Sequence, residues 1–113
     1  MIKSIVSALR TATSLPVFPF ATDGLKECVV YEWTPLSDDG AKETAQLMVR
    51  IKARDMATAE AKAAAVRSAL ISIGDNKNNK AWCKQNGGGT LRNEDTGFID
   101  WIMYFDLVYQ RGL

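Results

Sequence analysis

Two aspartates in the last segment of the chain are the residues that first suggest catalysis. Asp100 and Asp106 have the same parity in the alternating stretch GFIDWIMYFDLVYQR and would point to the same side of a strand. Six residues of extended chain separate them by roughly 20 Å, whereas the paired carboxylates of glycosidases stand about 5 to 9.5 Å apart. The spacing therefore predicts solvated or ion-paired aspartates rather than an acid and base acting together.

Two other motifs have the residue types of a binding loop without its pattern. NGGGT at 86–90 lacks the Lys-Ser/Thr ending of a phosphate loop and precedes no convincing helix. SDDG at 37–40 lacks the alternating acidic ligands and closing glutamate of a calcium loop. The chain has no histidine and two cysteines, Cys28 and Cys83, which leaves no Cys/His set for structural zinc and removes the commonest general base. We expect no enzymatic activity, no cofactor and no metal, and we expect reduced, partly buried thiols.

Length and charge restrict the class of protein further. The 113 residues are enough for one domain, 1–113, that buries roughly two thirds of the surface of its unfolded chain. Lys and Arg number 14 against 13 Asp and Glu, so a net charge of +1 gives no bulk attraction to nucleic acid or anionic lipid. Lys3 and Arg10 flank only a short apolar set, so we expect neither a signal peptide nor a membrane span, and a chain made in the cytoplasm.

A basic stripe lies on the segment that precedes the longer predicted helix. In 45–54 the apolar residues alternate with polar ones, which is typical of a half-buried strand. Arg50, Lys52 and Arg54 fall on the polar side and would form a stripe of three charges about 13 Å long. The stripe is either a solvated outer face or a contact for an acidic protein surface or nucleic acid.

The hydrophobic periods along the chain predict the elements that position these residues. An amphipathic helix is expected over the first dozen residues, and a second one after a cap at Asp55 or Thr58, with Gly74 placed to end it. Its apolar stripe consists of Met56, Ala59, Ala63, Val66, Leu70 and Ile73. Strands are expected at 17–18, 28–34, 45–54 and 98–110, with a hairpin of 81–85 and 90–94 closed by NGGGT, and with a polar connection at 35–43. This order predicts an α+β fold with an antiparallel (mixed) β-sheet of about four to five strands and two helices packed on one face.

The final predicted strand is long and unusually apolar on both sides. Twelve extended residues span roughly 40 Å, so it should bend at a bulge or run beyond its own sheet. Its outer parity combines the aspartates with an apolar set, which would be uncovered if both helices lie on the other face. The apolar set consists of Phe98, Ile102, Tyr104 and Val108. The aspartates could pair with the basic stripe within one subunit, or between subunits of a cyclic array.

Taken in order, several stretches resemble the tail terminator (tail-completion) proteins of long-tailed bacteriophages, a family that includes chains described as minor capsid or neck proteins. The resemblance is carried by IKSIVSALRTAT with LPVFP, by VVYEW, by TPLSDDGAKE, by LMVRIKARDMATAEAKAAAVRSAL and by DTGFIDWIMYFDLVYQR. It implies a virion protein, assembled in the host cytoplasm, that forms a homohexameric ring. The ring would cap the tail tube, stop its polymerisation and offer a surface to the head connector.

This resemblance and the surface pattern together give two sets of expected contact residues. The subunit interface is expected to include Arg50, Lys52, Arg54, Phe98, Asp100, Ile102, Tyr104 and Asp106. Contact with the tube is expected in the polar segment, at Ser37, Asp38, Asp39 and Lys42. Partners are other copies of the chain, the tube protein and the head connector, with no membrane and no sequence-specific nucleic acid. The alternatives are a head-closure or neck protein, and a small single-stranded nucleic-acid-binding domain in which Tyr104 and Phe98 stack bases.

Overall fold

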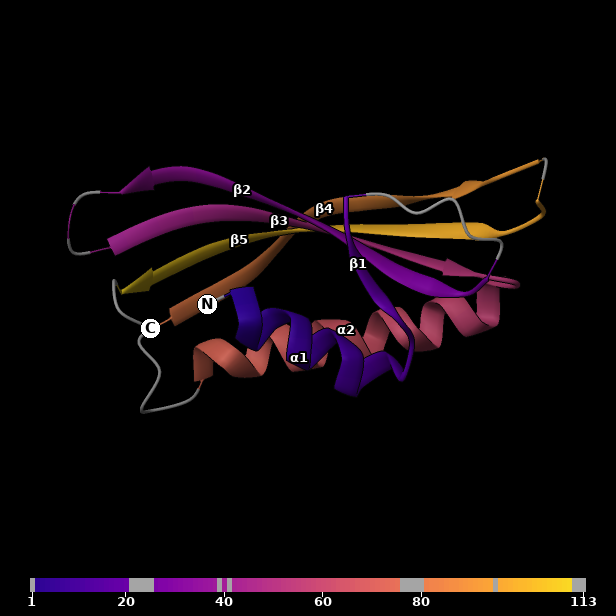
Figure 1. Cartoon of the computed structure of the whole chain (residues 1–113), viewed down its shortest axis with the longest axis horizontal. Helices are drawn as coiled ribbons and strands as arrows, with labels where there is room; N and C mark the ends of the chain where they lie inside the picture. The colour runs from indigo at the N-terminus through magenta and orange to yellow at the C-terminus, as the bar shows by residue number, and fades with distance from the viewer. Residues whose placement is uncertain are drawn as a thin grey trace.

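A five-stranded sheet with two helices on one face forms the fold. The computed structural model describes residues 2–20, 26–38, 40, 42–75, 81–94 and 96–110. The elements are α1 (Ile2–Thr13), β1 (Val17–Pro19), β2 (Cys28–Asp38), β3 (Lys42–Ala53), α2 (Met56–Asp75), β4 (Ala81–Arg92) and β5 (Ile99–Gln110). The strand order is β1-β2-β3-β5-β4, with β1 parallel to β2 and the other pairs antiparallel. Figure 1 shows both helices beneath the sheet, which confirms the predicted α+β class and its one-sided helical layer.

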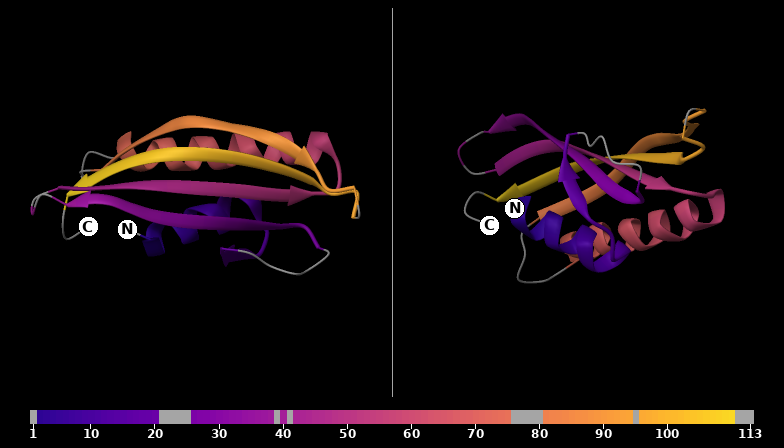
Figure 2. Two further views of the ribbon diagram at one scale, coloured as in Figure 1. Left: turned by 90° about the horizontal axis from the view of Figure 1, so that it is seen from above. Right: turned by 45° about the vertical axis from the view of Figure 1, so that its right-hand side comes forward.

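The helices divide the covered face between them. Helix α1 contacts β1 and β2, whereas α2 contacts β3, β5 and β4, and the two helices also pack on each other. Figure 2 shows α2 running along the length of the sheet on this side. Within the described residues, neither helix combines the length and the apolar composition that crossing a bilayer requires.

Helix α2 begins where the sequence predicted. The side chain of Asp55 accepts a hydrogen bond from the Thr58 amide at 2.7 Å, so Asp55 is the cap. Hydrogen bonds from the amide and the side chain of Thr58 lower the pKa of the Asp55 carboxyl. Met56 was expected in the apolar stripe but is 45% exposed. It is the first residue of the helix, and the buried stripe begins at Ala59. The helix continues to Asp75, one residue beyond Gly74, and the side chain of Ile73 lies outside the described residues.

The core lies between the helices and the inner parity of the strands. In β3 this parity is Ala45, Leu47, Val49, Ile51 and Ala53, all of which are buried as their alternation predicted. Across from them, β5 contributes Met103, Phe105 and Leu107, and the helices contribute Ile5, Leu9, Ala63, Val66 and Leu70. Small alanines on α2 let that helix lie close to the sheet, as the sequence indicated.

The predicted hairpin around NGGGT is wrong. Residues 81–92 form one continuous strand, β4, which pairs with β5 along its whole length and has a register shift between Gln85 and Gly88. The glycines therefore form a β-bulge inside a strand, and the chain reverses direction after Arg92 instead. The amide of Asn93 donates to the Phe98 carbonyl at 2.9 Å and closes that turn. Long pairing with β5 outweighs the low strand propensity of glycine here.

Gly88, the first residue that pairs with β5 after the bulge, has no room for a side chain. Its φ is +149°, and a Cβ at this position would lie 2.3 Å from the backbone oxygen of Ile102. We expect Gly88→Ala to lower the free energy of unfolding by about 2 kcal/mol or more, because two paired backbones would have to separate. Gly89→Ala is the matched control, since nothing lies within 4 Å of its Cβ position, and it should change stability by less than about 0.5 kcal/mol. Equal losses for the two variants in urea unfolding would contradict this role.

The polar connection predicted at 35–43 is also mostly strand. Strand β2 continues to Asp38 and β3 starts at Lys42, so only 39–41 separate them, and Asp39 lies outside the described residues. A register shift between Pro35 and Ser37 leaves Leu36 as the extra residue of a bulge. The bulge accommodates proline and polar residues in a strand that local propensity does not favour.

Strand β5 neither bends at a bulge of its own nor runs beyond the sheet. It lies between β3 and β4, each of which has 12 residues like β5 itself. Its length is therefore matched by its neighbours, and the molecule extends 45 Å along its longest axis. Because β5 is internal, its backbone groups are paired on both sides. Among the described strands, the open edges of the sheet are β4 on one side and, on the other side, β1 together with the part of β2 that extends beyond β1.

Candidate interaction surface

The face of the sheet opposite the helices, called the outer face below, carries most of the residues singled out in the sequence. It is formed by the strand parity opposite to the core. Register places its members in cross-strand rows: Lys52 with Asp100, Arg50 with Ile102, Met48 with Tyr104, Gln46 with Asp106, and Thr44 with Val108. No helix covers these rows in the part of the chain that the structure describes (Figure 1).

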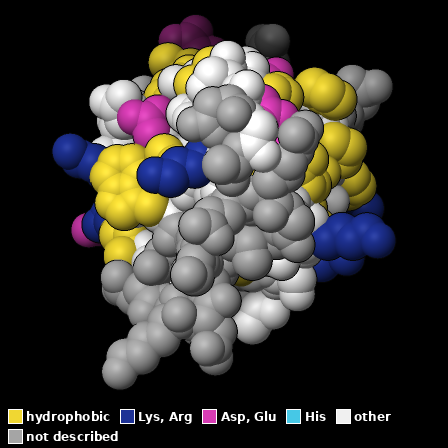
Figure 3. Space-filling view, turned by 90° about the vertical axis from the view of Figure 1, so that its left-hand side faces the viewer, with side chains coloured by type: hydrophobic (Ala, Val, Ile, Leu, Met, Phe, Trp, Pro, Cys, Tyr) yellow, Lys and Arg dark blue, Asp and Glu magenta, His cyan; other side chains and the backbone are white. Residues whose placement is uncertain are grey.

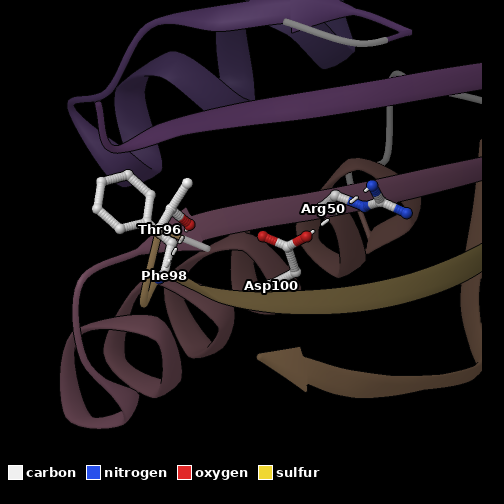
Figure 4. A network of polar contacts seen from close by, with 4 residues as sticks. All are labelled: Arg50, Thr96, Phe98 and Asp100. Atoms are coloured by element: carbon white, nitrogen blue, oxygen red, sulfur yellow. Dashed lines mark hydrogen bonds and ion pairs between the residues drawn. The ribbon is translucent and has the colours of Figure 1, made fainter. Parts of the chain in front are cut away.

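The basic stripe and the aspartates meet within one chain at Arg50 and Asp100. The guanidinium Nη1 of Arg50 lies 3.9 Å from Asp100 Oδ2, and the side chains are 38% and 13% exposed. Figure 4 shows the two side chains pointing toward each other from neighbouring strands. Arg50 Nε and Asp100 Oδ1 are buried and have no hydrogen-bond partner among the described residues. The contact is therefore an ion pair with incomplete hydrogen bonding.

The rest of the basic stripe is arranged less regularly than predicted. Lys52 lies on β3 directly opposite Asp100, but β3 ends at Ala53, so Arg54 follows the strand rather than extending its stripe. The amide of Arg54 donates to Glu27 at 3.0 Å, and its side chain is exposed. The strand thus presents two of the three predicted cations on the outer face.

The second aspartate of β5 is also engaged within the chain. Asn86, in the β4 bulge, donates its Nδ2 to Asp106 Oδ2 at 2.9 Å, and register places Lys84 directly opposite Asp106. Asp100 and Asp106 thus have different neighbours, and the structure does not bring them together. This arrangement agrees with the sequence argument against a catalytic carboxylate pair.

Large apolar side chains remain exposed on the outer face after the chain has folded. Tyr104 is 38% exposed. On the edge strand β4, Trp82 is 51% exposed and Leu91 is 59% exposed. Ile102 and Val108 are half-buried, while Phe98 precedes β5 and is half-buried in the turn. The sequence does not single out Trp82 and Leu91, because the predicted hairpin of 81–85 and 90–94 assigns their side chains to no face of the sheet.

The end of the β2–β3 hairpin is the second exposed feature. Figure 1 shows that β2 and β3 continue beyond the ends of both helices there. Leu36, at the bulge, is 58% exposed and lines a shallow pocket with Pro35, Ser37, Asp38, Glu43, Thr44 and Tyr109. Three of the four residues predicted to contact a tube are described at this end: Ser37, Asp38 and Lys42, all exposed.

Tyr109 holds this end of the hairpin in place on the helix side. Its ring packs on Trp33 with centroids 5.9 Å apart, and its hydroxyl donates to Glu43 Oε2 at 2.5 Å. Burial and this hydrogen bond to a carboxylate raise the pKa of Tyr109 to about 12. The neutral phenol is thus the form that the fold stabilises.

The raised pKa of Tyr109 predicts a defined alkaline effect. Because the phenol titrates near 10 in an unfolded chain and about 12 in the folded one, its contribution to stability is complete below pH 10 and is lost between pH 10 and 12. Tyr109→Phe cannot ionise, so wild type should lose its stability advantage over the variant in this window. Urea unfolding at pH 8 to 11.5 measures the difference. Parallel pH profiles for the two proteins would contradict it.

The two cysteines are buried thiols of the folded chain. Cys28 and Cys83 are free and buried, which is a deeper burial than the sequence indicated. Burial raises the pKa of both thiols, that of Cys83 to about 11, and so disfavours their nucleophilic form. Within the described residues, no group of three His, Cys, Asp or Glu side chains could hold a metal ion.

Comparisons with known proteins identify the fold. No family model and no curated protein matches the chain. A solved structure does match: a chain from the virion of a native gene transfer agent particle superposes with a TM-score of 0.63 at 18% sequence identity. The match covers 92% of this chain and 85% of the other, so nearly all of the fold is shared with a virion component.

Proposed function

We propose that this chain is a structural protein of a phage-like virion that forms a ring, caps the tail tube, ends its polymerisation and provides the surface on which the head docks. The observation that carries the proposal is the nearly full-length fold match to a chain of a gene transfer agent virion. The sequence resemblance to tail terminators supports the finer assignment to the tail end. An exposed apolar outer face agrees with a protein that works in an assembly.

In this proposal the outer face of β5 is part of the contact between subunits. Ile102 and Tyr104 would supply the apolar contact, with Phe98 at its margin and with Asp100 and Asp106 among the polar groups that set register. Arg50 already pairs with Asp100 in its own chain. The cations that would face the next copy are therefore Lys52 on the outer face and, beyond the end of β3, the exposed Arg54. Exposed ion pairs contribute only about 0 to 1 kcal/mol each, so the apolar contacts would supply most of the affinity.

The end of the β2–β3 hairpin is the proposed contact with the tube. Ser37, Asp38 and Lys42 are exposed there, beyond the ends of the helices, and Asp39 belongs to the same turn in the sequence. A two-stranded projection can insert between or against tube subunits without disturbing the ring. Because the hairpin is strand almost to its tip, its role would be to present these polar groups rather than to fold on binding.

The two alternatives predict different partners. A head-closure or neck protein would also form a ring but would bind heads before tails. A single-stranded nucleic-acid-binding sheet needs free cations beside aromatic rings, and here Arg50 is paired while Glu32, Asp100 and Asp106 share the face with the cations. The outer face therefore offers little net positive charge to a phosphate backbone.

An elongation assay separates these functions. Tube protein from the same particle is polymerised with and without this chain, and tube lengths are measured before purified heads are added. We expect elongation to stop when the chain is present, and heads to attach to capped tubes. Binding to heads with no effect on tubes would support the head-closure function instead. Submicromolar binding to single-stranded DNA at physiological salt, without either effect, would overturn the structural proposal.

A further inference from the structure

One row of residues crosses the whole sheet near the hairpin end and links its two open edges. Register pairs Ser37 with Thr44, Thr44 with Val108, and Val108 with Trp82. Leu36 is adjacent to Ser37 at the β2 edge, so Leu36 and Trp82 lie at the same level on opposite edges of the sheet. They are 58% and 51% exposed, and Figure 3, which looks onto this end, shows hydrophobic side chains on two opposite flanks.

The β2 edge is open at this level but is poorly suited to accept another strand. Strand β1 pairs only with Val29–Tyr31. The Val29 amide and the Tyr31 carbonyl point toward β1. Since the backbone groups of every second residue in a strand point to the same side, those of residues 33 and 35 point to the same side of β2, where no strand pairs with them. Residue 35 is proline and has no amide to donate, and the bulge at Leu36 interrupts the strand further. This edge therefore favours contact through the Leu36 side chain over extension of the sheet.

The two edges differ in charge as well as in shape. On the β2 side the exposed Glu32 lies one row beyond Thr34. On the β4 side the exposed Lys84 lies at the end of the cross-strand row formed by Thr34, Gln46 and Asp106. Arg67 of α2 also reaches this edge, where its Nε donates a hydrogen bond to Gln85 Oε1 at 2.9 Å. The acidic Glu32 thus lies four residues from Leu36 along one edge, and the basic Lys84 lies two residues from Trp82 along the other. Like charges do not meet when the two edges are brought together.

We propose that Leu36 of one copy packs against Trp82 of the next copy, with Glu32 of the first near Lys84 of the second. Because this contact joins two different surfaces of identical chains, a dimer still has one free surface of each kind. Further copies can therefore add at both ends until the array closes into a ring. Because Leu36 and Trp82 lie at the same level along the strands, the contact favours a closed ring, with its axis along the strands, over a helical filament. On the outer face Val108 pairs with Trp82, and the next row along β5 begins with Asp106 of the proposed interface, so the contact adjoins that interface. The inference rests on the proposed ring and names the surfaces that form it.

Cysteine cross-linking tests this contact. In the Leu36→Cys/Trp82→Cys double variant, oxidation should give a ladder of covalent species that ends at the size of the ring. Each single variant should give no ladder, and a 1:1 mixture of the two singles should stop at the dimer, because only one contact of the mixed pair carries both thiols. The native cysteines are buried and should form no cross-links. Oxidation of wild type checks this.

Leu36→Cys/Leu91→Cys is the matched control. Leu91 is 59% exposed on the same strand as Trp82 but pairs with Asp100, eight residues along β5 from Val108, or about 27 Å. No ladder is expected from it. If wild type forms rings by native mass spectrometry and the Leu36/Trp82 variant gives no ladder, or if both double variants give the same one, the contact is wrong while the ring stands. If wild type forms no ring even on tube ends, both the ring and the contact are wrong.

Discussion

A Tyr104→Asp variant should remain folded and lose the ring. Tyr104 is 38% exposed on the outer face, so the aspartate is solvated in the monomer and costs the fold little. In the proposed interface the same carboxylate would be removed from water among apolar groups without a partner. We expect a loss of about 2 to 4 kcal/mol per contact, or roughly a 30- to 1000-fold rise in the dissociation constant.

Native mass spectrometry over a range of concentrations measures this effect, and circular dichroism checks the fold. Tyr104→Phe is the matched control, because it keeps the aromatic side chain and adds no charge. This variant should assemble like wild type. Rings that persist at wild-type concentrations in Tyr104→Asp would exclude the outer face of β5 from the interface.

The neighbouring residue should show the opposite behaviour. Phe105 is fully buried on the helix side of β5, in the row of Leu47 and Gln85. Phe105→Ala should lower the free energy of unfolding by about 3 to 5 kcal/mol, since it removes a large core side chain and leaves a cavity. For a domain of this size the melting temperature should fall by roughly 10 to 20 °C.

Thermal and urea unfolding followed by circular dichroism measure this loss, with Tyr104→Phe again as the reference. The contrast between adjacent residues is the informative part, because it separates the face that stabilises the fold from the face that is proposed to bind. A loss below about 1 kcal/mol for Phe105→Ala would contradict the assignment of the helix-covered face as the core.

Periodic segments were the part of the fold that could be predicted from sequence. In strand β3 every second residue from Ala45 to Ala53 is buried, and Met48 is the one buried residue of the opposite parity in this strand. This alternation and the helical period of the small apolar stripe of α2 are the patterns that indicated a strand and a helix. From these two segments and the final strand, the α+β class and the one-sided helical layer follow. Asp55 could be predicted as a cap because its side chain acts locally.

The errors fall where tertiary pairing outweighs local propensity. The run Gly87–Gly89 and the segment around Pro35 both carry turn residues, yet each lies in a strand because β5 or β3 offers a long partner and a bulge absorbs the mismatch. Sequence alone does not show which strands are neighbours. The Arg50–Asp100 pair, and the exposure of Trp82 and Leu36 at the edges, depend on that order and could not be derived without the sheet.

In the proposed function, copies of this chain assemble as a ring on the tail tube. Electron microscopy of purified tail tubes, incubated with the protein and imaged end-on and from the side, tests it most directly. With wild type we expect a closed ring of six copies at one end of each tube, and with Tyr104→Asp we expect bare tube ends. Bare tube ends with wild type, together with a monomeric mass at every concentration, would contradict it.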